Sequence, residues 1–356
     1  MEILVASYRL AGTGGSQNYT YAIITELLRL GHNVEYFALN KGLVSDKIEQ
    51  LGVRFMSKRH YDLIIANYKL VTQLLFQRGY IIQTSHSILP GNDEPSLFAD
   101  YHVCVSEFQQ KFFLEKKIKC EVILNGIDCE RFYPETPVHK KLTRVLSLCQ
   151  SEEANKLIAS CCRRINVKFV KCYKLKHNVW DLEKEINKAD LVVGVGRSLY
   201  DAMACGRAVI SYDTRYVDRN FEGDGYLDKS NINASLVYNC CGGASRRFFT
   251  PEEFIIELKK YNSDDGAFMR EFAVKELNIR KSVERYLSIY NANANKNKKD
   301  GDTWWVPYYN ELYAEFEKLN AEITALKSSK AWRITAPLRN FAERMRKFKR
   351  SKNRRF

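Results

Sequence analysis

The stretch GVGRSLYDAMACGRAVI, residues 194–210, combines glycines, an arginine and a carboxylate where the pattern predicts the end of a strand and the start of a helix. Gly196 permits a sharp exit from the strand, and Ser198 is expected to be the N-cap of the helix. Arg197 then places its guanidinium beside the positive end of the helix dipole. N–H donors and a partial positive charge at one point favour binding of an anion such as phosphate.

Asp201 lies one helical turn after Arg197. Its carboxylate can accept hydrogen bonds from sugar hydroxyls while an anion binds at the start of the helix. The alternative interpretation is structural, with Arg197 paired to a neighbouring carboxylate and no ligand bound.

A second glycine-rich segment, GTGGS at residues 12–16, follows the first apolar run of the chain. Gly14 and Gly15 have no Cβ, so the backbone there can approach a phosphate or sugar closely, and Ser16 stands at the expected start of a helix. The segment is either a donor-binding loop or only a tight turn. It does not match the dinucleotide fingerprint, because no acidic residue is suitably placed at the end of the next strand.

The third segment with chemical potential is Thr-Ser-His at residues 84–86, which ends a predicted strand. A histidine there can donate a hydrogen bond to a sugar hydroxyl or stabilise developing charge, which makes His86 a candidate catalytic residue. The alternative is a histidine that only hydrogen-bonds to the backbone at the mouth of a loop.

Short apolar runs alternate with amphipathic helical patterns over residues 1–290, which predicts parallel sheets with helical crossovers. The runs predicted as strands are residues 3–7, 34–39, 63–66, 81–84, 103–105, 122–124, 145–148, 167–170, 191–195 and 209–211. Pro134 and Pro137 suggest a boundary between two doubly wound units near residues 134–142. Ligands bind at the carboxyl ends of such strands, where all three candidate segments stand.

Cysteine usage and the start of the chain bear on its location. The ten cysteines form no C-x-x-C pair, so we predict reduced thiols and no zinc site. An apolar strand pattern begins at residue 3, which leaves no room for a signal peptide, and no run reaches 18 apolar residues. We therefore expect a cytoplasmic protein that does not span a membrane.

The formal net charge of +14 is concentrated at one end of the chain. From residue 327 onward there are twelve Lys and Arg and one acidic residue, Glu343, so eleven of the fourteen net charges lie there. The rest of the chain is close to neutral and shows no base-stacking module, so no nucleic-acid partner is expected for it.

Residues 303–327 predict an amphipathic helix that follows a polar linker at 291–302, NANANKNKKDGD. Its apolar seam consists of Tyr309, Leu312, Phe316, Leu319, Ile323 and Leu326. The seam either packs on the protein's own surface or forms a short coiled-coil dimer through residues 305–327.

Two longer motifs resemble glycosyltransferases of the GT-B fold, family 4 (group 1 type). Residues 125–134, NGIDCERFYP, match the interdomain pattern N-G-I-D-x-x-R-F-x-P of that family. Residues 189–193, ADLVV, and 201–210, DAMACGRAVI, match its A-D-h-h-h strand and its E-A-M-A-x-G-x-P-V-I helix and strand. The resemblance covers residues 1–290.

This resemblance implies an α/β GT-B architecture, with two Rossmann-like doubly wound domains facing a cleft and a C-terminal helical extension. The expected domains are 1–136 (acceptor side), 137–290 (nucleotide-sugar binding), 291–302 (linker), 303–327 (amphipathic helix) and 328–356 (basic, membrane-associating tail). The implied reaction moves a sugar from a nucleotide-sugar donor to a saccharide or lipid-linked acceptor, with retention of anomeric configuration and with neither a metal nor a cofactor. The implied donor-binding residues are Gly14, Gly15, Ser16, Gly196, Arg197, Ser198 and Asp201, and the implied catalytic residues are His86, Arg197 and Asp201.

The chain departs from the family in its charged residues. The family's paired glutamates, eight positions apart, fall at Val193 and Asp201, so the first is missing. Where the family places a diphosphate-binding arginine and lysine, this chain has LCQS at 148–151, and Lys156 is out of register by about two residues. Arg197 is therefore the leading candidate for the phosphate-binding cation. A non-catalytic carbohydrate-binding or scaffolding subunit is the alternative function.

The end of the chain, SSKAWRITAPLR at 328–339, is similar to a terminal motif of bacterial polysaccharide-assembly proteins. Beyond it, Phe341, Met345 and Phe348 share one helical face among basic residues, a pattern that suits an anionic membrane surface. The alternatives are a solvated basic tail and a tail that binds nucleic acid, of which the membrane surface fits the implied chemistry better. Together these features predict peripheral attachment to the inner face of the membrane and a role in polysaccharide or lipopolysaccharide synthesis.

Overall fold

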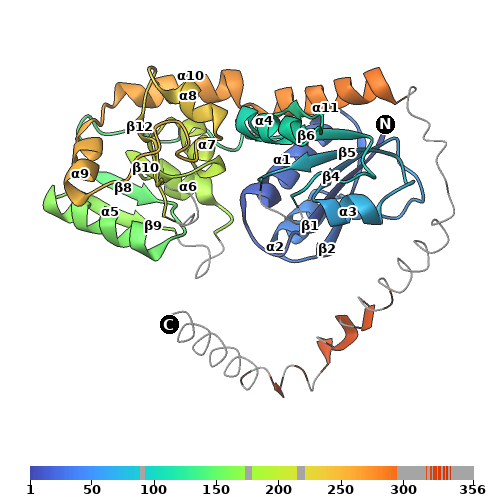
Figure 1. Ribbon diagram of the computed structural model, residues 1–356. Coiled ribbons are helices and arrows are strands. Elements are labelled where there is room, and N and C mark those ends of the chain that lie inside the picture. Colours follow the sequence, from blue (N-terminus) through green and yellow to red (C-terminus); the bar gives the residue numbers. More distant parts are fainter. Residues whose placement is uncertain are drawn as a thin grey trace, which may run out of the picture. The chain divides into compact units, whose positions relative to one another are not determined.

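The computed structural model describes residues 1–88, 93–172, 179–214 and 221–294, together with scattered residues between 318 and 337. The chain divides into two compact units, Met1–Asn297 and Lys298–Phe356. The first unit holds all the strands of the described residues, and Figure 1 labels most of them.

The N-terminal half of this unit is built on a parallel seven-stranded sheet with the order β3-β2-β1-β4-β5-β6-β7. The strands are β1 (Glu2–Arg9), β2 (Asn33–Asn40), β3 (Arg54–Phe55), β4 (Leu63–Asn67), β5 (Tyr80–Ser85), β6 (Tyr101–Cys104) and β7 (Glu121–Val122). The helices are α1 (Gly15–Arg29), α2 (Leu43–Glu49), α3 (Lys69–Leu74) and α4 (Glu107–Glu115). The chain builds outward from β1 in one direction and then returns to its other side with β4, so the strand order reverses between β1 and β4.

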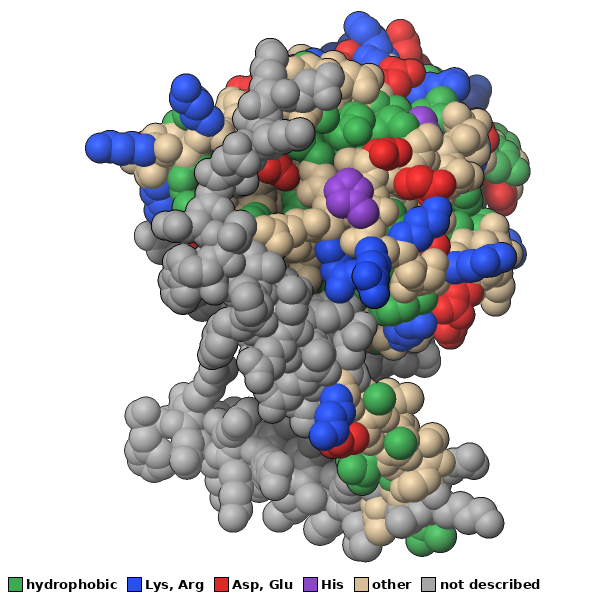
Figure 2. Space-filling view, turned by 90° about the vertical axis from the view of Figure 1, so that its right-hand side faces the viewer, with side chains coloured by type: hydrophobic (Ala, Val, Ile, Leu, Met, Phe, Trp, Pro, Cys, Tyr) green, Lys and Arg blue, Asp and Glu red, His purple; other side chains and the backbone are tan. Residues whose placement is uncertain are grey.

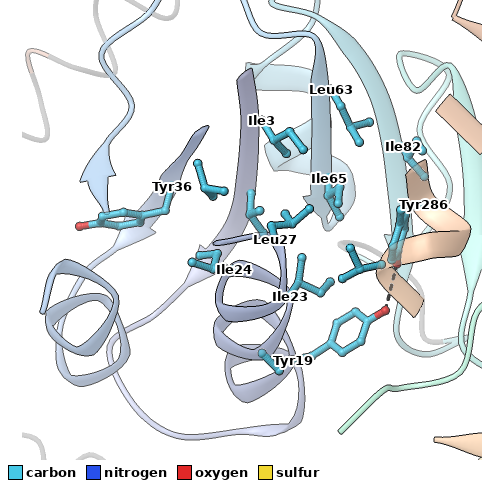
Figure 3. Close-up of a cluster of buried hydrophobic side chains, with 14 of the residues drawn as sticks. Ile3, Tyr19, Ile23, Ile24, Leu27, Tyr36, Leu63, Ile65, Ile82 and Tyr286 are labelled. Atoms are coloured by element: carbon cyan, nitrogen blue, oxygen red, sulfur yellow. Dashed lines mark hydrogen bonds between the residues drawn. The ribbon is translucent and has the colours of Figure 1, made fainter. Parts of the chain in front are cut away.

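The apolar runs explain why this sheet is central. Residues 3–6 of β1 and all five residues of β4 are buried, and successive side chains of a strand point to opposite faces. Both faces of the sheet are therefore covered, as is usual for parallel sheets with helical crossovers. Figure 3 shows one of the two faces, where Ile23, Ile24 and Leu27 of α1 pack among side chains of the strands.

The C-terminal half contains a five-stranded sheet with the order β12-β11-β10-β8-β9. Its strands are β8 (Arg144–Ser147), β9 (Lys168–Lys171), β10 (Leu191–Gly194), β11 (Ala208–Ser211) and β12 (Gly225–Leu227), of which only β12 is antiparallel to its neighbour. Its helices are α5 (Glu152–Arg164), α6 (Leu182–Asn187), α7 (Arg197–Ala204), α8 (Ile232–Val237), α9 (Pro251–Lys259) and α10 (Asp264–Glu276). Here the strand order reverses between β8 and β10.

All ten predicted strands are present, with ends displaced by up to a few residues, and the fold class of two doubly wound units is confirmed. The sequence pattern missed β3 and β12. These strands have two and three residues, which is too short for an apolar run or an alternation to stand out.

The last helix of this unit, α11 (Ile279–Asn293), packs against the N-terminal half. Its residues Ile279, Val283, Tyr286 and Ile289 belong to the same apolar cluster as α1 and the first sheet. Residues up to 290 were expected to belong with the second half, and the expected linker began at 291. Helix α11 instead crosses back and continues through Asn293 (Figure 1).

The chain passes between the halves at two segments that touch each other. Ile127 and Asn278 form an isolated parallel bridge, in which the Ile127 amide donates to Leu277 and the Ile279 amide donates to Ile127. These hydrogen bonds join the segment that leaves the N-terminal half to the segment that returns to it.

Residues 295–302 of the expected linker and most of the C-terminal unit lie outside the described residues, including the seam residues Tyr309, Leu312, Phe316, Leu319 and Ile323. In the predicted helix 303–327, Lys318, Ala321, Glu322 and 324–326 are helical where they are described, and Leu326 is 57% exposed. In the basic tail, Ile334 is 77% exposed. The dimer and the membrane-binding helix therefore stay predictions.

Charge and sulfur chemistry follow the composition. Figure 2 shows acidic and basic side chains interspersed over one face of the chain's first unit. All ten cysteines lie within the described residues, and all are free thiols. None of the described helices has the length and apolar character needed to cross a bilayer.

Candidate active site

The candidate site lies where the reversal points of the two sheets face each other. Loops that follow β1 in the first sheet and β8 and β10 in the second line one cleft, as expected for ligand sites of parallel sheets. The cleft contains about 500 Å³ of space, including the part open to solvent. It is lined by Thr13, Gly14, Gly15, Asn18, Leu148, Gln150, Cys172, Val179, Leu182, Arg197, Ser198 and Asp201.

Five of the sequence-predicted residues meet in this cleft, from both halves of the unit. They are Gly14, Gly15, Arg197, Ser198 and Asp201. Ser16 and Gly196 do not line it but are the chain neighbours of Gly15 and Arg197, which do, and His86 is not among the lining residues. Lys156 is exposed on α5 and is not among the lining residues, so it does not replace the missing cations.

The glycine-rich loop brings the two halves into contact. Gly14 is the N-cap of α1 and Gly15 its first residue. A Cβ added to Gly15 would lie 4.0 Å from the Cβ of Arg197, which is ordinary van der Waals contact. The start of α1 therefore lies beside the start of α7, and a ligand in the cleft that both helix starts line could touch both.

Helix α7 begins two residues earlier than predicted. Its N-cap is Gly196, with φ of +60°, and Ser198 is the second helical residue. The prediction that Ser198 caps the helix is wrong, because the turn out of β10 needs the left-handed conformation that glycine adopts most readily. Gly196 contributes no side chain to the helix start, so no side-chain hydrogen bond caps α7.

Arg197 is buried in the wall of the cleft, with 7% of its surface exposed. Its Nη1 donates to the carbonyl oxygen of Gly126 at 2.6 Å, and its Nε lies 3.7 Å from a carboxylate oxygen of Asp201. Among the described residues this Nε has no hydrogen-bond partner. Burial lowers the pKa of the guanidinium, and the Asp201 carboxylate partly opposes that shift.

The contacts of Arg197 bear on both of its interpretations, structural pairing with a carboxylate and binding of an anion. The approach of Asp201 is the structural pairing, although it is too long for a hydrogen bond. A buried N–H group without an acceptor costs about 1–3 kcal/mol. The Nε atoms of Arg144 and Arg207 also have no acceptor among the described residues, but of the three arginines only Arg197 lines the cleft. The Nε of Arg197, in a cleft that joins two sheets, is thus placed to donate to an anionic oxygen.

His86 follows β5 and is half-buried beside the cleft. Its Nε2 lies 2.8 Å from Oδ1 of Asn67, and its backbone N–H donates to Asp93. The ring stands edge-on to Tyr19, with centroids 5.5 Å apart, and Tyr68 lies on another side at 6.0 Å. The histidine therefore contacts side chains, which excludes the simple backbone-bonded alternative.

Burial lowers the pKa of His86 to about 4. The nearby charge of Arg197 also lowers this pKa, whereas the carboxylate of Asp93 raises it. The imidazole is therefore neutral at pH 7. An unfolded histidine takes up its proton near pH 6.5. Between these values the unfolded chain binds more protons, so the free energy of unfolding contributed by His86 falls as the pH drops through this window.

Tyr19 connects His86 to Arg197, because its ring also lies 5.9 Å from the Arg197 guanidinium carbon. Its hydroxyl is 3.2 Å from that of Tyr286 on α11 (Figure 3). The Tyr286 hydroxyl is in turn 2.7 Å from the Thr84 hydroxyl. Burial raises the pKa of Tyr19 to about 12, so it is an uncharged support. Helix α11 therefore contacts Tyr19 through Tyr286, and Tyr19 packs against Arg197 in the wall of the cleft.

Sequence reasoning missed several site residues. Asn67 and Tyr19 were not singled out, and Asn125 was recognised only as part of a motif. Asn125 donates to Asn239, which also accepts a hydrogen bond from Tyr200, and so links the crossing segment to the C-terminal half. A usable signal existed for Asn67, because it is a polar residue at the end of a buried strand, as His86 is after the next one.

The described residues contain no cluster of three or more His, Cys, Asp or Glu that could hold a metal ion. The charge available in the cleft comes from Arg197 and from the N-termini of α1 and α7.

No model of a known protein family matches the sequence, and no curated protein matches it either. The structure is similar to a glycosyltransferase from Rickettsia africae ESF-5, at 12% identity and a TM-score of 0.52, over 83% of this chain and 99% of that one. It is also similar to the catalytic domain of starch synthase IV from Arabidopsis thaliana bound to ADP and acarbose, at 11% identity and a TM-score of 0.52, over 83% and 99%.

A third similar structure is an α-glucosyltransferase in complex with UDP and DNA, at 10% identity and a TM-score of 0.50, over 82% of this chain and 99% of that one. At these identities the likeness concerns the fold. Together with the two reversal points that face one cleft, it shows that this chain has the GT-B fold.

Proposed function

We propose that this protein is a glycosyltransferase that moves a sugar from a nucleotide-sugar donor to a saccharide or lipid-linked acceptor during cell-surface polysaccharide or lipopolysaccharide synthesis. The proposal combines the GT-B fold with the motifs at residues 125–134 and 189–210, which resemble family 4. Glycosyltransferases with this fold include structures that contain UDP or ADP.

One observation carries the proposal. The Nε of Arg197 is buried without a hydrogen-bond acceptor among the described residues, in a cleft that also exposes the glycine backbone at the start of α1. A diphosphate in this cleft, beside Gly15 and Arg197, would satisfy this donor and neutralise the charge that burial disfavours.

The same groups suggest the mechanism. The leaving diphosphate gains negative charge in the transition state, and Arg197 and the N-termini of α1 and α7 are fixed in place to stabilise it. With retention, a donor phosphate oxygen takes the proton of the acceptor hydroxyl, so no protein base is needed. The low pKa of His86 fits this scheme, because a neutral imidazole exchanges hydrogen bonds with sugar hydroxyls without adding charge.

The direct test is hydrolysis of nucleotide sugars without an acceptor. A panel of UDP, ADP, GDP and TDP sugars is first screened by thermal shift, and release of nucleoside diphosphate is then measured for those that raise the Tm. We expect at least one to raise the Tm and to be slowly hydrolysed. A chain that binds none of them contradicts the proposal.

Val193 favours a second candidate function, a non-catalytic carbohydrate-binding or scaffolding subunit. This residue stands where the family has its first glutamate, and it is fully buried within β10, so no carboxylate reaches the cleft from there. Binding of a nucleotide sugar or a saccharide without any turnover, with or without acceptors, would support this function over transfer.

We further propose that transfer needs no metal ion. If Arg197 and the helix N-termini stabilise the diphosphate, excess EDTA should change the rate of nucleoside diphosphate release by less than twofold, and added Mg²⁺ or Mn²⁺ should not raise it. A loss of activity in EDTA that Mg²⁺ restores would contradict this arrangement. Dialysed enzyme without EDTA is the control.

The tail at 328–356 is proposed to bind anionic membranes. Each basic residue near anionic headgroups contributes about 1 kcal/mol, and the tail carries an excess of them. The full chain should sediment with vesicles of phosphatidylglycerol and phosphatidylcholine, whereas a chain ending at residue 327 should stay in solution. Vesicles of phosphatidylcholine alone are the control, and equal sedimentation of both chains would end the membrane proposal.

The apolar seam at 305–327 is proposed either to pack on the protein's own surface or to form a coiled-coil dimer. Sedimentation equilibrium of the full chain and of a chain ending at residue 304 distinguishes the two. A dimer that disappears on truncation supports the coiled coil, and a monomer in both cases supports packing on the protein's own surface.

A further inference from the structure

Two cysteine thiols lie next to each other at the edge of the first sheet, away from the residues that line the cleft. Cys104 is the last residue of β6, and Cys120 stands immediately before β7. Their Sγ atoms are 3.4 Å apart. Cys104 is fully buried, whereas Cys120 is partly exposed. The pair therefore joins a thiol that solvent can reach to one that it cannot.

The surrounding contacts hold Cys120 beside Cys104. Nε2 of Gln110, on α4, donates to the carbonyl oxygen of Cys120 at 2.9 Å. Glu121, the next residue of the chain, pairs its carboxylate with Arg285 of α11. The Sγ of Cys104 lies 3.6 Å from the carbonyl oxygen of Glu121. Contacts from β6, α4 and α11 thus fix the segment that carries Cys120.

Strand β7 is the least firmly held strand of this sheet's β6 side. It has two residues and lies at the sheet edge, where it pairs only with β6. Its register pairs are Val103 with Glu121 and Cys104 with Val122. A disulfide bond is about 2.05 Å long, so the two sulfur atoms must approach by roughly 1.4 Å from their 3.4 Å contact. A two-residue edge strand with a partner on one side only can make this movement.

The two thiols differ in how readily they lose a proton. The Cys104 thiol can donate a hydrogen bond to a thiolate at Cys120, which lowers the pKa of Cys120. The same hydrogen bond, together with burial, raises the pKa of Cys104. The thiolate is the reactive form of cysteine, and redox-sensitive cysteines are accessible, have a low pKa and lie beside a second cysteine that resolves the first product. Cys120 meets the first description and Cys104 the second.

We propose that Cys104 and Cys120 are an oxidation site, at which a peroxide converts the two thiols into a reversible disulfide that ties β7 to β6. The Cys120 thiolate first attacks one oxygen of the peroxide, which breaks the O–O bond, gives the sulfenic acid of Cys120 and, with hydrogen peroxide, releases hydroxide. The sulfur of Cys104 then attacks the sulfenic sulfur, and its proton leaves with the displaced hydroxide as water. Together with the proton that Cys120 lost at the start, two thiols and one hydrogen peroxide give one disulfide and two waters.

The disulfide would strengthen the start of the crossing between the two halves. The amide of Ile123, directly after β7, donates to the carbonyl oxygen of Cys104, and the chain then runs on to Gly126. A bond between residues 16 positions apart encloses α4 and stabilises the fold mainly by restricting the unfolded chain. Oxidation should therefore raise the Tm by several degrees. This expectation does not depend on which reaction the protein catalyses.

Peptide mapping of the full-length chain tests the bond directly. The reduced protein is treated with hydrogen peroxide, remaining thiols are blocked with N-ethylmaleimide, and a tryptic digest is analysed by mass spectrometry without reduction. We expect two peptides joined through Cys104 and Cys120, which dithiothreitol separates. Cys129 lies on the same tryptic peptide as Cys120, so fragmentation of the joined peptides must locate the bond. A bond through Cys129, or both thiols recovered unlinked, overturns the inference.

Cys120→Ser removes the accessible thiol with little change in shape, and Cys104→Ala removes its partner. Cys172→Ser is the matched control, because Cys172 is also a partly exposed thiol, but burial raises its pKa. Peroxide should raise the Tm of the wild type and of Cys172→Ser, and dithiothreitol should reverse the rise. Neither Cys120→Ser nor Cys104→Ala should respond. An equal rise in Cys120→Ser, or a mapped bond without any rise in the wild type, contradicts the proposed tie between β7 and β6.

Discussion

Replacing Arg197 with alanine is expected to slow release of nucleoside diphosphate by about 10²- to 10³-fold, the effect of removing one fixed donor from a developing anion. The guanidinium is the one strong cation among the residues described as lining the cleft. The loss should appear mainly in kcat, because the diphosphate gains its charge in the transition state. Steady-state kinetics on the nucleotide sugar identified by thermal shift measures it.

The control must separate chemistry from folding, because Arg197 also bonds to Gly126. Arg207 is a second buried arginine, but its Nη2 donates only to structural acceptors on Thr136 and Asn187. An Arg207→Lys variant should therefore lower the Tm while the folded enzyme keeps its kcat. Near-normal kinetics in Arg197→Ala, or an equal loss of kcat in Arg207→Lys, would remove Arg197 from the proposed role.

A Gly126→Ala substitution is expected to lower the free energy of unfolding by about 3 kcal/mol, the upper end of the cost of overpacking. A Cβ at Gly126 would lie 2.7 Å from the Cα of Ile279 and 2.5 Å from the hydroxyl oxygen of Ser282. A main-chain atom cannot move aside as a side chain can, so the two segments of the crossing must separate. The Gly126 carbonyl that holds Arg197 would move with them, and affinity for the donor should fall as well.

Gly15→Ala is the comparison for this prediction. Its added Cβ would meet Arg197 only at 4.0 Å, and alanine is favoured over glycine in a helix. Urea denaturation should show unchanged or slightly greater stability for Gly15→Ala, with weaker nucleotide binding if the donor approaches this backbone. Equal stabilities of the two alanine variants would disprove the tight crossing at Gly126.

The sequence was sufficient to predict the architecture because the strands that form the centres of both sheets are long apolar runs. The segments 63–66 and 191–195 are short, continuous apolar runs, a pattern that favours buried strands. Helix α11 was predictable as a helix, since its apolar residues recur at helical spacing. The sheet that α11 covers was not predictable, because its apolar face fits either half equally well. Only the paired crossing at Ile127 and Asn278 decides this.

The sequence predicts which residues form the candidate site better than it predicts the contacts between them. Glycine loops and an arginine at strand ends indicate a ligand edge, and Gly14, Gly15, Arg197 and Asp201 do share one cleft. The bond from Arg197 to Gly126 joins residues 71 positions apart, and no local pattern reports it. The capping role given to Ser198 was wrong because its chemistry suits an N-cap, whereas the backbone turn requires glycine one position before Arg197.

The return of α11 to the N-terminal half also sets an order of events during synthesis on the ribosome. The first sheet emerges early, but Val283, Tyr286 and Ile289, which complete its apolar cluster, are translated only after the whole second half. One side of the first sheet therefore stays uncovered while about 150 further residues are translated. Premature termination before residue 279 would leave that flank open to chaperones and proteases, so cellular quality control would selectively remove incomplete chains.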